Sequence, residues 1–245
     1  MVKIRKSKKI KEEVFPIENA DVLSKQISQS EEFVKKNQNL IIGILGTIII
    51  VLLSFSLFNY YKENQNINAQ EEMFQAVYYY EQDSIVKALN GDGNNYGFLE
   101  IIDEYGFSEA ANLSNFYAGS SYLKLGNYEN AIKYLKSFSS SDLLIQARAY
   151  SLIGDAYVEM MDYDNAIKYF EKASSNNPNE YFTPSYLLKL ALVYEQVDDL
   201  ESALDCYITI INEFKDSSEF QISIKNRSRI EGLILWVLTL VLIVN

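Results

Sequence analysis

The feature that most constrains this fold is a pattern of small, aromatic and apolar residues that occurs three times at nearly constant spacing. Gly119 and Gly154 occupy one position of the pattern 35 residues apart, and Ala191 occupies it 37 residues later. A period of this length is typical of repeated helix pairs. The three copies consist, in order, of Asn115, Ala118, Gly119, Tyr122, Ala131 and Leu135; Tyr150, Ile153, Gly154, Tyr157, Ala166, Phe170 and Pro178; and Leu187, Leu190, Ala191, Tyr194, Ala203 and Tyr207.

This pattern resembles the consensus of the tetratricopeptide repeat. In that consensus a bulky aromatic, Leu-Gly and Tyr precede Ala-x3-Phe and Pro on a period of about 34 residues. The resemblance implies an all-α fold in which each repeat supplies two helices and the repeats stack into an α-solenoid. Such stacks present a concave binding surface and rarely contain a catalytic site.

Residues 110–232 are therefore predicted to form three repeats, each with a helix A and a helix B. Gly119 and Gly154 are expected where the two helices of one repeat cross closely. Thr183 followed by Pro184 is a good helix start, because a hydroxyl residue caps and proline fits the first turn. The predicted helices A cover about 110–124, 144–160 and 184–196, and the helices B about 128–138, 164–174 and 200–214.

An uncharged apolar stretch covers residues 40–58. As an α-helix it would be about 28 Å long, close to the hydrocarbon thickness of a bilayer. Tyr60 and Tyr61 lie where an interfacial aromatic belt is expected. A cleavable signal peptide is disfavoured because polar sequence precedes a run that is too long, and a buried core helix because no polar face interrupts the run. We predict a single transmembrane helix over 39–61 that contacts the lipid bilayer through this stretch.

Charge is distributed unevenly around this segment. Residues 1–38 carry 9 Lys/Arg and 6 Asp/Glu, net +3, whereas residues 39–245 carry 13 and 27, net −14, which together make the overall −11. The positive-inside rule therefore predicts that the polar tail 1–38, with a short helix around Ala20–Lys36, is cytoplasmic and that the repeats lie across the membrane. The acidic body argues against nucleic acid as a partner, because phosphate binding needs a basic face.

Residues 62–109 are predicted to form a degenerate first repeat that covers the apolar face of the next repeat. An apolar stripe indicates one helix over 64–90. Gly and Asn residues at 90–95 then break the chain, and a short helix from Phe98 to Tyr105 follows.

The C-terminal tail, residues 233–245, is strongly apolar. Twelve residues from Leu233 to Val244 contain no charge, and as a helix they would reach about 18 Å, too short to span a bilayer unaided. Two interpretations stay open: an interfacial segment anchored by Trp236, or a helix that covers the last repeat.

The residues that carry most enzyme chemistry are missing. The chain has no histidine and one cysteine, Cys206, which we expect to be a small buried residue. The loop from Asp92 to Asp103 partly matches a calcium-binding pattern, but Tyr96 replaces a ligand and position 12 is Asp instead of Glu, so a structural turn is favoured. We therefore predict no catalytic residue, no metal, no cofactor and no small-molecule substrate, which disfavours a hydrolase or a regulatory enzyme subunit.

The concave surface of the stack is the predicted binding site, and helix A residues should line it. Its composition is apolar and acidic, without the Lys/Arg/Asn set that clamps a C-terminal carboxylate. An extended or helical segment of another protein fits such a groove better, although several of the apolar residues could instead pack against neighbouring helices. The predicted groove residues are Leu113, Phe116, Ser120, Leu123, Arg148, Ser151, Asp155, Val158, Ser185, Leu188, Leu192 and Glu195.

The order of basic tail, single span and acidic repeats resembles the YfgM-type tetratricopeptide proteins of bacterial inner membranes. The resemblance covers the span, the segment from Ala88 to Gly106 and the stretch from Ala110 to Gly154. It implies a periplasmic ancillary subunit of the Sec translocon that works beside a periplasmic chaperone. The alternative is a structural subunit of another cell-envelope assembly, such as an outer-membrane biogenesis or gliding-type complex.

Overall fold

The computed structural model describes residues 20–244, so the lysine-rich stretch at positions 3–11 lies outside the described residues. All regular elements in the described part are helices, which confirms the predicted all-α fold. The chain divides into two compact units, Met1–Asn59 and Tyr60–Asn245.

The first unit contains α1 (Ala20–Lys36) and the first part of α2 (Gln38–Glu81). The predicted short helix in the N-terminal tail is therefore confirmed as α1. Within the described residues, α2 is the one helix long and apolar enough to cross a membrane, and none of its most apolar window is buried. This finding fits the predicted span over residues 40–58.

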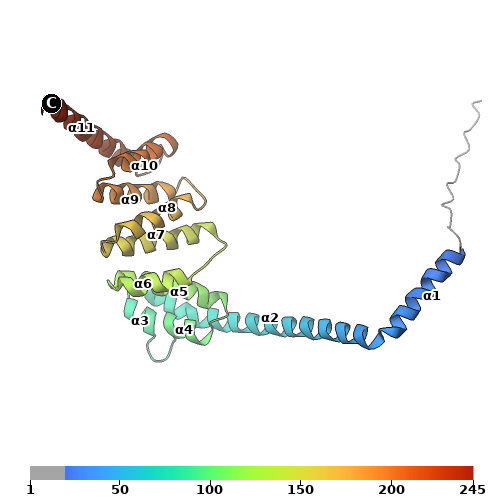
Figure 1. Cartoon of the computed structure of the whole chain (residues 1–245). Helices are drawn as coiled ribbons and strands as arrows, with labels where there is room; N and C mark the ends of the chain where they lie inside the picture. Colours follow the sequence, from blue (N-terminus) through green and yellow to red (C-terminus); the bar gives the residue numbers. More distant parts are fainter. Residues whose placement is uncertain (1–19, 245) are drawn as a thin grey trace, which may run out of the picture. The chain divides into compact units, whose positions relative to one another are not determined.

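In the second unit the predicted helix pairs are present, with ends within two residues of those expected. Figure 1 shows α5 to α10 stacked as successive pairs. Each helix B begins with an Asn or Asp whose side chain accepts a hydrogen bond from the backbone N–H three residues later, which satisfies one free amide of the first turn. The pairs are α5 (Glu109–Lys124) with α6 (Tyr128–Ser137), α7 (Leu143–Glu159) with α8 (Tyr163–Ser175), and α9 (Thr183–Gln196) with α10 (Leu200–Glu213).

The turn between helices A and B has the same geometry in all three pairs. Gly126, Met161 and Asp198 take up left-handed φ angles of 73°, 57° and 59°. The next residue then donates its N–H to the carbonyl of the repeat's tyrosine, as Asp162 does to Tyr157 at 2.9 Å. A non-glycine residue in this region costs about 1–2 kcal/mol, which the hydrogen bonds closing the helix end offset.

The same turn occurs a fourth time, after α2. Asp83 has a φ of 56°, and the N–H of Ser84 donates to the carbonyl of Tyr79 at 2.9 Å. The predicted single helix over 64–90 is therefore wrong: α2 ends at Glu81, and α3 (Ile85–Asn90) is a separate element. The end of α2 and α3 form the first helix pair, because fully buried Ala76 and Ala88 lie three residues before and nine after Tyr79, as Gly154 and Ala166 do around Tyr157.

The second helix of this first pair is short, and α4 (Phe98–Glu104) packs against both α3 and α5. The loop between α3 and α4 is closed by Asp92, whose carboxylate accepts hydrogen bonds from the N–H groups of Asn94 and Asn95 and from the Tyr79 hydroxyl. These bonds hold the pKa of Asp92 well below its usual range, the Tyr79 bond contributing most. The Asp92 carboxylate is thus engaged in the hydrogen bonds that close this loop.

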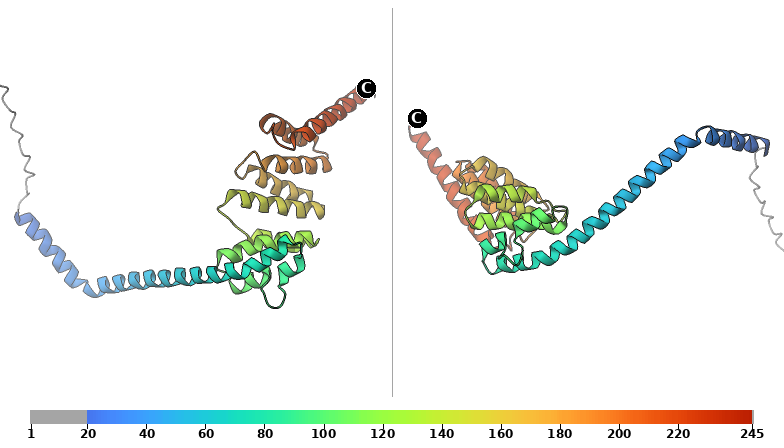
Figure 2. Two further views of the ribbon diagram at one scale, coloured as in Figure 1. Left: turned by 180° about the vertical axis from the view of Figure 1, so that it is seen from behind. Right: turned by 90° about the horizontal axis from the view of Figure 1, so that it is seen from below.

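The last helix, α11 (Phe220–Val244), leaves the stack beyond α10, as Figure 2 also shows. Its first part packs on the last repeat, with Ser223 and Ile230 fully buried. The Tyr207 hydroxyl donates to Glu195 at 2.7 Å and accepts from the Asn226 amide at 3.1 Å. This part of α11 covers the end of the stack. Leu233, Leu235 and Trp236 are exposed, the side chains beyond Trp236 are outside the described set, and the role of the tail stays a prediction.

The buried tyrosines predict that the fold loses stability at alkaline pH. Burial, with a hydrogen bond to Glu195, raises the pKa of Tyr207, and burial with a bond to Glu171 raises that of Tyr194. Since an unfolded tyrosine has a pKa of about 10, these contributions are fully present below that pH and are lost as the pH rises above it. Circular dichroism should show a lower melting temperature at about pH 11 than at about pH 8.

Two tyrosine variants serve as controls for this experiment. Tyr207→Phe should weaken the alkaline dependence, because the titrating phenol is gone, whereas Tyr181→Phe, at an 86% exposed position, should leave it unchanged. An equal melting temperature at both pH values would contradict the expectation.

Candidate functional site

Ten of the twelve predicted groove residues fall into three groups in the structure, and the first group packs into the core. Leu113 and Leu123 contact the cluster around Leu135 and Ile153. Val158 and Leu188 contact the cluster around Phe170 and Leu190. These four side chains therefore contribute to repeat stacking.

The second group is engaged in polar contacts within the stack. Asp155 pairs with the ammonium of Lys189 at 2.7 and 2.8 Å, and Ser151 accepts from the same ammonium at 3.3 Å. Ser120 shares a hydrogen bond of 2.6 Å with the Tyr80 hydroxyl. Glu195 accepts a hydrogen bond from Tyr207 of α10 and forms an ion pair with Arg229 of α11. Two predicted residues lie outside the three groups: Ser185 is half-buried, and Leu192 is 45% exposed.

The role of Lys189 was not predicted from the sequence. It stands in an otherwise apolar stretch of a helix A, one helical turn before Leu192, which follows Asp155 by the 37 residues that separate these two repeats. The ammonium also lies 5.8 Å from the centre of the Phe170 ring. The available signal was an isolated charge one helical turn from the position that corresponds to Asp155 in the next repeat.

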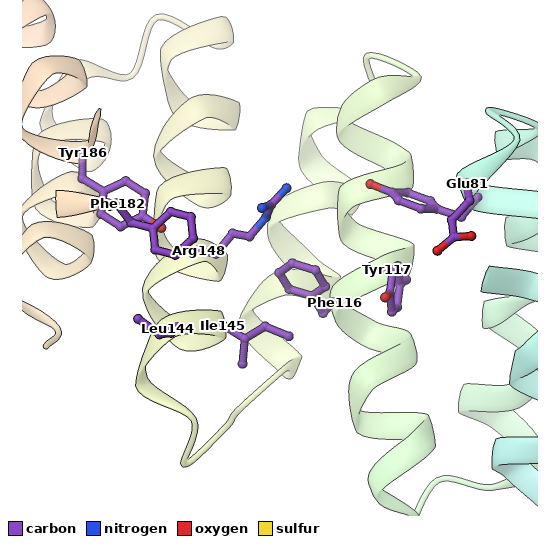
Figure 3. A pocket seen from close by; sticks show the side chains of 9 residues that line it. Glu81, Phe116, Tyr117, Leu144, Ile145, Arg148, Phe182 and Tyr186 are labelled. Carbon is purple, nitrogen blue, oxygen red and sulfur yellow. The ribbon is translucent and has the colours of Figure 1, made fainter. Parts of the chain in front are cut away.

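The third group, Phe116 and Arg148, lines a pocket of about 420 Å³. The pocket is formed by side chains from four consecutive helices A, at the end of α2 and in α5, α7 and α9, and by the residue that precedes α9. Figure 3 shows Arg148 extending from α7 toward α5, with aromatic rings on both sides of it. The lining residues are Tyr80 and Glu81 of α2, Phe116 and Tyr117 of α5, Leu144, Ile145 and Arg148 of α7, and Phe182 and Tyr186 at the start of α9.

Ring contacts hold the α5 side of the pocket in place. Tyr117 stacks on the fully buried Phe98 with ring centres 5.1 Å apart and an interplanar angle of 10°. Tyr80 meets the edge of Tyr117 at 5.2 Å, and its hydroxyl is bonded to Ser120. Because these rings are fixed by their neighbours, the pocket surface is largely formed before any ligand arrives.

The electrostatics of the pocket are simple. Burial raises the pKa of Tyr117 and Tyr186, while the Arg148 guanidinium acts in the opposite direction on both phenols. The phenols are therefore neutral, and the charged residues among the lining set are Arg148 and Glu81. Within the part of the chain that the structure describes, Arg148 makes no hydrogen bond or ion pair, and it is exposed.

Six of the aromatic and apolar lining residues, including Leu144, were missed from the sequence. Tyr80 lies four residues after Ala76, the spacing of Leu123 from Gly119 and of Val158 from Gly154. It was missed because the end of α2 was not identified as a helix A. Tyr117, Ile145, Phe182 and Tyr186 lie off the helix A positions used for the prediction, and they reach the pocket through the angle between successive repeats.

Outside the pocket, the described residues provide neither a cluster of metal ligands nor a reactive thiol. Among the described residues, no group of three or more Asp, Glu, Cys or His side chains could hold a metal ion. Cys206 is buried as predicted, and burial raises the pKa of its thiol to about 12. The neutral thiol is a poor nucleophile at physiological pH.

Comparison with protein families supports the repeat assignment. Two family models, each described as tetratricopeptide repeat, match residues 115–141 and 147–180. No curated protein matches the chain. The matched stretches lie within α5–α6 and across α7–α8, the pairs that supply Phe116, Tyr117 and Arg148 to the pocket.

Proposed function

We propose that this tetratricopeptide-repeat chain is a membrane-anchored docking protein whose pocket binds an apolar segment of another protein. The observation that carries the proposal is the pocket itself, in which aromatic rings from successive repeats surround an exposed guanidinium that lacks a partner among the described residues. Tyrosine and arginine are enriched at the energetic centres of protein interfaces.

The chemistry of the pocket defines the segment that it would accept. A volume of about 420 Å³ holds one or two large apolar side chains, and Arg148 would pair with a carboxylate beside them. A short helix or extended strand with an apolar anchor next to Asp or Glu meets both conditions. Glu81, on the α2 side, would disfavour an acid at the opposite end of the segment.

Membrane attachment would raise the local concentration of the pocket at the bilayer. The exposed apolar part of α2 supports attachment, and Lys35 and Lys36 just before it support a cytoplasmic N-terminus and a periplasmic repeat unit. The resemblance to YfgM-type proteins supports a role beside the Sec translocon and a periplasmic chaperone.

A site-specific crosslinking experiment tests the docking role. A photoreactive residue at Phe182, which is 41% exposed in the pocket, should capture a discrete partner in native membranes. The same residue at Lys168, exposed on α8, should not. Arg148→Glu should reduce the Phe182 adduct at least about tenfold, because a charge-assisted hydrogen bond of roughly 1.5–3 kcal/mol is lost.

Lys168→Glu is the matched control, since it makes the same charge reversal on another helix. Equal loss of adduct in both variants would show that the effect is only one of net charge and would remove the pocket from the proposal. Translocon or periplasmic chaperone subunits in the adduct would support the export role. Subunits of another envelope assembly would instead support the alternative function.

A further inference from the structure

The N-terminal helix α1 separates its apolar and charged residues. Ile27 and Val34 are seven residues apart and lie on one face, and Phe33 lies about 100° around the helix from Val34. Lys25 and Glu32 lie on the opposite face. Ile27, Val34 and Phe33 are 53%, 51% and 65% exposed. No other described part of the first unit therefore covers this face.

The location of α1 indicates what covers that face. The helix ends at Lys36, and α2 begins at Gln38. The intervening Asn37 donates both its backbone N–H and its side-chain amide to the carbonyl of Phe33, at 3.0 and 2.9 Å. These bonds satisfy the Phe33 carbonyl in the last turn of α1, and the apolar face ends at Val34, six residues before the uncharged stretch 40–58 begins.

We propose that α1 is an interfacial helix that lies on the membrane surface with Ile27, Phe33 and Val34 in the lipid. The inference rests on the proposed membrane span in α2. A helix with an apolar face and a charged face binds the boundary between headgroups and acyl chains. Because α1 is joined to the span by one residue, its apolar face meets lipid at a high effective concentration.

The charged residues of α1 fit this position. α1 carries as many lysines (Lys25, Lys35 and Lys36) as acids (Asp21, Glu31 and Glu32), but Lys35 and Lys36 are the charges nearest the uncharged stretch. Cations are attracted to the anionic headgroups of the cytoplasmic leaflet. Lys35 and Lys36 are also in the last turn of α1, where they interact favourably with the helix dipole. Contact with a second copy of this chain would require an apolar face that continues without interruption along α1. The polar Ser30 lies in the middle of the face formed by Ile27, Phe33 and Val34.

Spin labels on the full-length chain in vesicles of phosphatidylethanolamine and phosphatidylglycerol test the proposal. The chain would carry Cys206→Ala and one new cysteine at a time. Nitroxides on Ile27→Cys and Val34→Cys should relax several-fold more with dioxygen, which concentrates in lipid, than with a water-soluble nickel chelate. Nitroxides on Lys25→Cys and Glu32→Cys should show the reverse preference.

An additional label on Ile49→Cys, in the middle of the apolar stretch, tests the membrane span in α2 separately from the interfacial helix α1. Lipid contact at Ile49 with nickel access at all four α1 positions would overturn the interfacial helix and leave the span intact. Shielding of Ile27 and Val34 from both reagents would also overturn it, in favour of a protein neighbour. Nickel access at Ile49 would remove the span and the inference together.

Discussion

Replacing Phe170 with alanine is expected to destabilise the repeat unit by about 3–5 kcal/mol. The ring is 1% exposed and packs in a cluster with Leu190, Val193 and Tyr207. It also fills the space over Gly154, where a Cβ atom would lie 2.7 Å from the ring. Its removal leaves a cavity between α7 and α8 and takes away the aromatic face beneath Lys189.

The expected loss is large because a domain of ordinary stability has about 5–15 kcal/mol in total. Chemical denaturation of wild type and variant, followed by circular dichroism, measures the difference. Phe74→Ala is the matched control, since it removes the same atoms from a side chain that is 76% exposed. The control should change stability by no more than about 0.5 kcal/mol. Equal effects of the two variants would show that Phe170 is not part of a tightly packed core.

A second large effect is expected from adding a single methyl group at Gly119. A Cβ atom there would lie 2.5 Å from Leu135 Cγ, 2.9 Å from the Leu135 nitrogen and 3.0 Å from the Ala131 oxygen. Two of these atoms belong to the α6 backbone, so α5 and α6 would have to move apart. Gly119→Ala should therefore destabilise the fold by about 1–3 kcal/mol, although alanine is the better helix former.

Two other glycines provide graded controls for that prediction. At Gly154 the nearest atoms all belong to the Phe170 ring, which can tilt, so Gly154→Ala should cost less than Gly119→Ala. At Gly232 in α11 no atom lies within 4 Å, and Gly232→Ala should stabilise the helix by about 0.5–1 kcal/mol. Thermal unfolding of the three variants should give that order, and a neutral Gly119→Ala would show that the helices do not cross as closely as described.

Most of the repeat architecture could be predicted from the sequence because its determinants are local. The ends of α5 to α10 follow from caps such as Asn127 and Asp162 and from the spacing of tyrosine and alanine within one helix pair. The close crossing at Gly119 and Gly154 was expected for the same reason and is confirmed. A degenerate first repeat was expected over 62–109, but its helices were assigned wrongly because α3 stops at Asn90, before the Ala-x3-aromatic pattern is complete.

The candidate site was less predictable. Of the twelve residues expected in the groove, Phe116 and Arg148 line the pocket, and the binding role of all twelve stays a prediction. Asp155 was expected to face a partner, but Lys189 of the next repeat holds it. Such pairings depend on how far one repeat rotates against the next, which no single repeat specifies.

The sequence by itself determined the three helix pairs from α5 to α10, their period, the turns within them and the apolar stretch of α2, because each depends on residues within one or two helical turns or within one repeat. Only the tertiary structure decided that Tyr80, Tyr117 and Tyr186 meet around Arg148 and that α11 closes the stack through Tyr207 and Asn226. Those contacts join side chains far apart in the chain, and the packing angle between repeats brings them together.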